Sequence, residues 1–187
     1  MPFDINGAVL QAENAAIKIV TNGVTGLTFD SSGISKDSTR PYFVAQGTAD
    51  WTNYSSAAWN DITQLGYVLI NNGSHYNTDN GRFTAPITGT YYFFASTYTQ
   101  KYTATNADSY THPIFRINGS YTARQASYTN PYRLRTRTYY SSSYTTDTQI
   151  NDIFQLTAGD YVNYHIYSSA ALRFYPPYSI FGGFLIG

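Results

Sequence analysis

The run of four aromatic residues Tyr91–Phe94 constrains the fold of this chain more than any other feature. Pro86 ends the β-prone segment before it, because proline lacks a donor for a sheet ladder, and Gly89 permits a tight turn back. Successive side chains on a strand point to opposite faces, so this strand carries aromatic rings on both. A strand with one face in water alternates apolar and polar residues, so we expect both faces to be buried. One face can fill a sandwich core. The other needs a second layer, which another copy of the chain would supply.

Aromatic and small residues recur at fixed spacing through this region: Asn71, Tyr76, Phe83, Gly89, Tyr91 and Phe93. The spacing resembles the signature of the C1q globular domain, a jelly roll that forms trimers and shares its architecture with tumour necrosis factor. Two positions depart from that signature. Leu65 stands where Phe is usual, and Ala95 stands where Phe or Tyr is usual. The resemblance therefore implies a smaller core side chain at Ala95, with space for its neighbours to fill.

The resemblance covers about residues 40–187. Residues 40–45 resemble the family's opening strand, 154–162 its hairpin around a Gly-Asp pair, and 179–186 its closing strand. It implies an all-β fold, a C1q/TNF-like jelly-roll β-sandwich that is homotrimeric. We expect the aromatic strand and the apolar C-terminal strand to supply the core and threefold contacts. These residues are Tyr91, Tyr92, Phe93, Phe94, Ile180, Phe181, Phe184 and Leu185.

Turn-forming pairs recur at the spacing of a sandwich, and no long segment has the 3.6-residue period of a helix. The sequence therefore predicts short strands joined by turns throughout the domain. The pairs are Asn72-Gly73, Asn80-Gly81, Thr88-Gly89, Asn118-Gly119, Asn130-Pro131, Gly159-Asp160 and Pro176-Pro177.

Residues 1–39 differ from the rest of the chain and are too few to enclose a core. The pattern predicts short strands over 15–20 and 26–30, with a turn at Asn22-Gly23, and a helical turn or two over 8–16. We expect this segment to pack on another surface as a β-rich N-terminal attachment arm. It resembles the short β stretches that precede trimeric C1q-like tips in bacteriophage fibre and decoration proteins.

Charge and composition exclude several classes of function. The formal net charge is zero and only 12% of residues are charged, so no overall field attracts nucleic acid or an anionic membrane. The absence of cysteine excludes disulfides and thiolate chemistry. His75, His112 and His165 share no metal-ligand spacing, and we interpret His165 as a satisfied polar residue of a strand and not as a base. We therefore expect no catalytic residue, no cofactor, no metal and no membrane insertion. The N-terminus also lacks the pattern of a signal peptide.

Arginine and tyrosine alternate in one segment of the domain, which makes it the candidate recognition surface. Tyrosine rings stack on sugars, and arginine forks match carboxylates or phosphates. Two other interpretations stay open: a solvated edge strand blunted by charge, and an arginine ladder that pairs with acids of a neighbouring subunit. The residues are Tyr128, Tyr132, Arg133, Arg135, Arg137, Tyr139 and Tyr140.

Together these features predict a non-enzymatic structural protein of a bacteriophage virion: a head decoration or cement protein, a head fibre or a tail-fibre tip. Residues 1–39 would dock on other virion proteins, and the homotrimeric domain of residues 40–187 would project outward, where a host-surface glycan is a further candidate partner. Such a protein is assembled in the host cytoplasm and resides in the virion. The alternative is a free-standing, extracellular recognition module of lectin or cytokine type.

Overall fold

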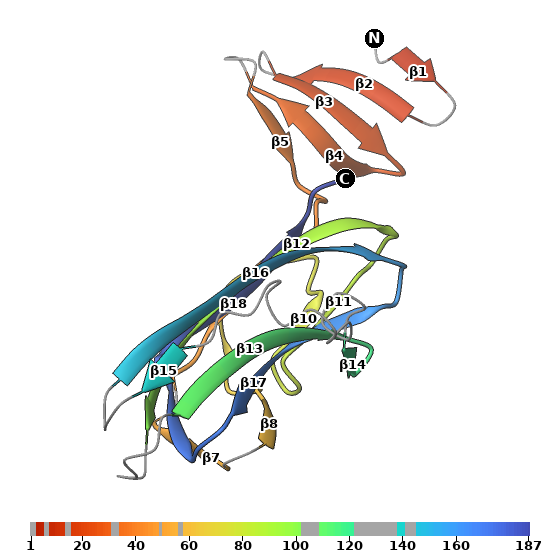
Figure 1. Cartoon of the computed structure of the whole chain (residues 1–187). Helices are drawn as coiled ribbons and strands as arrows, with labels where there is room; N and C mark the ends of the chain where they lie inside the picture. The colour runs from red at the N-terminus through yellow and green to blue at the C-terminus, as the bar shows by residue number, and fades with distance from the viewer. Residues whose placement is uncertain are drawn as a thin grey trace. The chain divides into compact units, whose positions relative to one another are not determined.

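A computed structural model describes residues 3–5, 8–13, 16–30, 34–48, 50–55, 58–101, 109–121, 138–140 and 145–187. The chain divides into two compact units, an arm unit (Met1–Pro41) and a sandwich unit (Tyr42–Gly187), both seen in Figure 1. The residues that the model describes form strands and turns, and they include no helix long and apolar enough to cross a membrane.

The arm unit is one antiparallel sheet whose strands follow chain order. From Ile17 to Arg40, every side chain whose burial is described is exposed or half-buried. No core is therefore formed by this part of the arm. The strands are β1 (Phe3–Ile5), β2 (Ala8–Glu13), β3 (Ala16–Thr21), β4 (Val24–Phe29) and β5 (Ser35–Asp37).

The expected helical turn over 8–16 is wrong, because β2 lies there between β1 and β3. In β2, Val9 pairs with Asp4 on one side and with Val20 on the other. Two neighbouring strands satisfy the backbone of this segment, and that pairing overrides a weak local preference. The Asn22-Gly23 turn is confirmed: both residues have positive φ, 49° and 76°, and they close a two-residue hairpin.

The sandwich unit has two antiparallel sheets. The strands of the first are β8 (Ala58–Asp61), β10 (Tyr76–Asn77), β11 (Arg82–Thr84), β13 (Ser109–Ile117), β14 (Ser120–Tyr121), β15 (Thr138–Tyr140) and β17 (Tyr161–Ser168). They run in the order β10-β11-β17-β13-β14, with β8 paired to β17 and β15 paired to β13.

The strands of the second sheet are β6 (Tyr42–Gln46), β7 (Thr52–Tyr54), β9 (Tyr67–Asn72), β12 (Gly89–Lys101), β16 (Thr145–Leu156) and β18 (Leu172–Leu185). They run in the order β16-β12-β18-β6-β9, with β7 paired to β18. These are the layers and the non-sequential neighbours of the predicted jelly roll (Figure 1).

Two links that the sequence predicts to be turns between neighbouring strands of one sheet instead connect strands of different sheets. β11 pairs with β17 and β12 pairs with β16 and β18, so the link through Pro86 joins opposite layers. The predicted hairpin over 154–162 is wrong for the same reason, since β16 and β17 belong to different sheets. Crossing lets the aromatic residues of consecutive strands face one another: the Phe83 and Tyr91 ring centroids lie 5.7 Å apart across the core.

The Pro176-Pro177 pair does not form a turn between strands, because it lies inside β18. Tyr175 pairs with Tyr98 and Ile180 with Ser96, so the residues between them are extra on the β18 side. Proline is tolerated at such a bulge because it has no ladder donor to lose.

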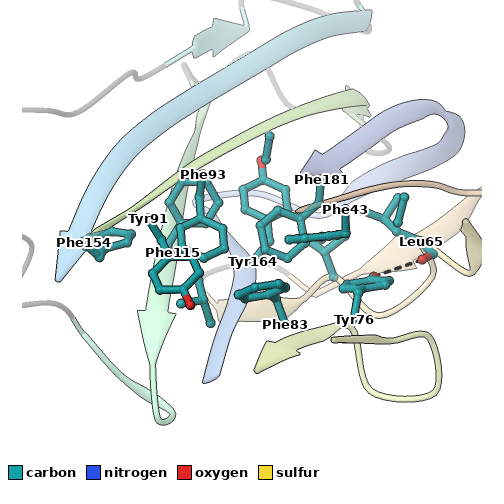
Figure 2. Close-up of a cluster of buried hydrophobic side chains, with 14 of the residues drawn as sticks. Phe43, Leu65, Tyr76, Phe83, Tyr91, Phe93, Phe115, Phe154, Tyr164 and Phe181 are labelled. Atoms are coloured by element: carbon teal, nitrogen blue, oxygen red, sulfur yellow. Dashed lines mark hydrogen bonds between the residues drawn. The ribbon is translucent and has the colours of Figure 1, made fainter. Parts of the chain in front are cut away.

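Burial along β12 alternates strictly, and this confirms that rings on one of its faces fill the core. Tyr91 and Phe93 are fully buried, while Tyr92 and Phe94 on the other face are half-buried. Figure 2 shows Phe93 in the core beside Phe115, Phe154 and other rings from both sheets. The core thus rests on aromatic rings packed edge-to-face and stacked.

The two positions that depart from the family signature are both buried in this core. Ala95 pairs with Phe181 of β18, whose ring packs against those of Phe93 and Phe115 at 6.1 and 5.7 Å. Phe181 thus supplies the aromatic bulk beside the small Ala95. Leu65 accepts a hydrogen bond at its carbonyl from the Tyr76 hydroxyl at 3.0 Å, drawn as a dashed line in Figure 2.

At the other end of β12 the inward positions change from rings to hydroxyls, at Thr97 and Thr99. The Thr97 hydroxyl lies 2.8 Å from that of Tyr164 on β17, and the Thr111 hydroxyl of β13 lies 2.9 Å from that of Thr148 on β16. Each pair joins one sheet to the other. Hydrogen bonds therefore join the sheets at this end, beside the buried apolar side chains of Leu172 and Phe174.

Two adjacent glycines on β18 make room for rings of β12. Gly182 pairs with Phe94, and Gly183 pairs with Phe93. A Cβ on Gly183 would lie 2.4 Å from Cδ1 of Phe93 and 2.9 Å from the Tyr92 carbonyl oxygen. Glycine is needed here because the ring covers the backbone itself.

We expect Gly183→Ala to destabilise the protein by about 1–3 kcal/mol, because overpacking displaces the Phe93 ring. Thermal unfolding followed by circular dichroism measures the change. Gly66→Ala is the matched control, since a Cβ at that exposed glycine meets nothing within 4 Å. Equal melting temperatures for the two variants would contradict the packing argument.

Candidate interaction surfaces

One register row on the outward side of the six-stranded sheet is apolar from strand to strand. Tyr42 of β6 pairs with Phe184 of β18, Phe184 with Tyr92 of β12, and Tyr92 with Ile153 of β16. The exposed fractions are 38% for Tyr42, 39% for Phe184 and 46% for Ile153. We call Tyr42, Phe184, Tyr92 and Ile153 the apolar row. A contiguous exposed apolar surface of this kind marks an interaction site.

The residues predicted for core and threefold contacts separate into two groups. Tyr91, Phe93 and Phe181 are fully buried, and Leu185 packs against the core cluster. The others lie on the outward face of the six-stranded sheet: Tyr92, Phe94, Ile180 and Phe184.

The outward face also carries a ring cluster that the sequence did not indicate: Trp51, Tyr98, Tyr175 and Tyr178. The Trp51 and Tyr175 centroids lie 4.7 Å apart, and the Tyr175 and Tyr178 centroids lie 4.8 Å apart. The extra residues in β18 bring Tyr178 back beside Tyr98, at 5.4 Å. The sequence does not indicate this cluster, because Pro176-Pro177 predicts a turn between strands, whereas the pair forms a bulge within β18.

Most of the predicted Arg/Tyr recognition surface lies outside the described residues, namely Tyr128, Tyr132, Arg133, Arg135 and Arg137. Tyr139 and Tyr140 belong to β15, which pairs with β13 so that Tyr139 stands opposite Tyr110. These two tyrosines therefore belong to the seven-stranded sheet. Its role in recognition stays a prediction.

The outward side of the seven-stranded sheet carries a row of polar side chains, Arg82–Asn163–Arg116, contributed by β11, β17 and β13. The Arg82 guanidinium carbon lies 4.2 Å from the centre of the Tyr161 ring, and that of Arg116 lies 5.7 Å from the Trp59 ring. We call Arg82, Arg116, Asn163, His165, Tyr161 and Trp59 the cationic face. Its strands are far apart in sequence, so no local motif could have revealed it.

His165 sits in this face, opposite Asp61 of β8. Its Nδ1 lies 2.6 Å from Oδ1 of Asp61, but the approach is outside the angular range of a hydrogen bond. Burial of the imidazole, followed by the charges of Arg116 and Arg82, lowers the pKa of His165 to about 3. The ring is therefore neutral at physiological pH. Neither ring nitrogen has a hydrogen-bond partner among the described residues, so the expectation of a satisfied polar residue is wrong.

The described residues contain no group of three or more His, Cys, Asp or Glu side chains placed to hold a metal ion.

Comparison with known proteins places the fold. The sequence model of the C1q domain family matches residues 43–186 of this chain. The chain belongs to the C1q domain family. Among solved structures, the globular domain of zebrafish complement 1qA is 16% identical, with a TM-score of 0.49, and the match covers 79% of this chain and 98% of that one. The crystal structure of murine APRIL at pH 8.0 is 12% identical, with a TM-score of 0.50, and the match covers 79% of this chain and 99% of that one. The likeness at such identities concerns the fold. No curated protein matches in sequence.

We expect acid to destabilise this C1q domain partly through His165. Its pKa in the folded state is about 3, below the 6.5 of a free histidine, so the unfolded chain takes up a proton that the folded chain does not. The stability contributed by the neutral ring is fully present above pH 6.5 and is lost as pH falls from 6.5 toward 3. The melting temperature should therefore drop more between pH 7 and pH 4 in the wild type than in His165→Gln. Parallel pH profiles would contradict this, since carboxyl groups such as Asp160 titrate in both proteins.

Proposed function

We propose that this protein is a non-enzymatic, homotrimeric structural component of a bacteriophage virion. It would act as a head decoration or cement protein, a head fibre or a tail-fibre tip. The arm unit would dock on the particle, and the C1q domain would project outward. The observation that carries this proposal is the arm unit itself: a separate sheet in which no side chain from Ile17 to Arg40 whose burial is described is buried. A sheet without a core needs a partner surface to bury one of its faces.

The apolar row supports a homotrimer. It runs over four neighbouring strands of one sheet, and its rings are held in place by their neighbours: the Tyr92 and Phe184 centroids lie 5.3 Å apart. Burial of such apolar surface contributes about 25 cal/mol of binding free energy for each Å², and this favours association. A stable interface buries roughly 600–1,000 Å² on each partner, an area that a whole sheet face can supply. Domains of the C1q family are typically trimeric recognition modules, and this favours self-association.

The alternative is a free-standing, extracellular recognition module of lectin or cytokine type. Membership of the C1q domain family supports it, because these domains are typically non-enzymatic binding modules. Gene neighbourhood separates the two functions: capsid or tail genes beside this one favour the virion, and isolation from them favours the free module.

We expect the wild type to sediment at three times 20.9 kDa. Phe184→Asp should give monomers at micromolar concentration, because it places a charge in the centre of a desolvated apolar surface. Thr84→Asp adds the same charge at an exposed position on the other sheet and should remain trimeric. A monomeric wild type, or a trimeric Phe184→Asp variant, would rule out assembly through the apolar row.

Deletion of residues 1–39 should leave a soluble trimer that no longer attaches to phage particles. Particles that lack the protein are mixed with full-length or truncated trimer and sedimented, and the bound fraction is measured. The C1q domain retains both of its sheets in the truncated chain, so the loss would be confined to docking. Unchanged attachment would refute a docking role for the arm unit.

A further inference from the structure

Hydrogen-bonding groups that the fold does not use gather on the cationic face. Asn163 and His165 are only 6% and 2% exposed. Arg82 Nε, Asn163 Oδ1 and His165 Nε2 are shielded from solvent, and none has a hydrogen-bond partner among the described residues. An unpaired buried donor or acceptor costs about 1–3 kcal/mol, so native proteins keep few of them. Three such atoms on neighbouring strands indicate a surface kept for a ligand.

The charge of this face is positive. Arg82 and Arg116 flank Asn163 in one register row, so their Cα atoms lie roughly 10 Å apart, two strand spacings. On the seven-stranded sheet, Asp61 is the acidic residue among the described outward strand positions, and 58% of its side chain is exposed. Both arginine charges also lower the pKa of His165, so their fields meet at the middle of the face. With His165 neutral, the two guanidinium groups give the described strand positions of this face a positive charge.

Aromatic rings hold the two arginines and add apolar surface. The Arg82 side chain lies over Tyr161, and that of Arg116 lies toward Trp59. Such contacts hold the guanidinium groups on this face in the free protein. The Trp59 ring packs 5.2 Å from Tyr167, and both are half-buried, so part of each ring faces solvent. A half-exposed ring beside a charged fork can contact the C–H face of a sugar while the fork binds an anionic group.

We propose that the cationic face binds a carboxylated saccharide. Arg82 and Arg116 bind its carboxylate through paired N–H donors, a geometry that the planar guanidinium matches. Trp59 and Tyr167, whose rings are half-exposed, pack against the sugar ring. Asn163 Oδ1 accepts a hydrogen bond from a sugar hydroxyl when the arginine side chains turn toward the ligand. Nucleic acid fits less well, because the chain has zero net charge and the face carries only two arginines.

This site gives the glycan-binding part of the proposed function a location and a ligand class. It rests on that function only for the biological source of the saccharide. The apolar row lies on the other sheet, so the trimer proposed above leaves the cationic face uncovered by contacts through that row.

Isothermal titration with oligogalacturonate tests the site on the full chain. Methyl-esterified oligogalacturonate, which has the same sugar backbone without the charge, should bind at least tenfold more weakly. Arg82→Gln should weaken oligogalacturonate binding at least tenfold. Arg82→Lys keeps the charge without the fork and should fall between the wild type and Arg82→Gln. Arg173→Gln removes the same charge from β18 on the other sheet and should bind like the wild type.

Circular dichroism and sedimentation on each variant establish that it is folded and trimeric. Equal affinity for the two oligosaccharides, wild-type affinity in Arg82→Gln, or no binding by the trimeric wild type would overturn the proposal. A change of oligomeric state in Arg82→Gln would assign the face to contacts between copies and would also overturn it. These failures leave the virion role intact, because attachment through the arm unit is measured separately.

Discussion

The sandwich unit depends on the pleat of one strand, β12. Its side chains alternate between two faces, and it pairs along its length with β16 on one side and β18 on the other. Rings therefore stand on both faces of the central part of a sheet, where neighbours hold them in place. The inward rings organise the core, and the outward rings create an apolar surface that the same fold exposes. The glycine pair at Gly182-Gly183 is the counterpart of this arrangement, because it lets the sheet accept large rings on both faces at one point.

Local patterns predicted the parts of this structure that depend on one strand or one turn. Alternation along Tyr91–Phe94 indicated which side chains enter the core, and Asn22-Gly23 and Asn118-Gly119 form two-residue hairpins with positive φ. Which strands become neighbours was less predictable. A period of two identifies the buried face but not the partner strand, so the link through Pro86 was expected to return within one sheet. Burial of aromatic rings favours the crossing between sheets, because the rings of Phe83 and Tyr91 face each other from opposite layers.

The candidate surfaces show the same division. The alternation along β12 predicts that Tyr92 faces outward. It does not predict that Ile153 of β16 and Tyr42 of β6 lie in the same row. The cationic face could not be predicted, since Arg82 and Arg116 become neighbours of Asn163 only through the jelly-roll order of the strands. The apolar row and the cationic face thus lie on different sheets. Self-association through one and recognition through the other would not compete for the same area.

The hydroxyl pairs at one end of the core give the sandwich a mechanical asymmetry. Thr97 with Tyr164, and Thr111 with Thr148, join the two sheets by directional bonds, whereas stacked rings such as Phe115 and Phe181 join them elsewhere. Ring contacts tolerate small sliding movements, because dispersion attraction changes little as two flat surfaces shift. Hydrogen bonds weaken steeply when their angle changes. A shearing load applied across the sheets would therefore meet stiff resistance at the threonine end and softer resistance at the aromatic end, so that the layers would pivot about the threonines.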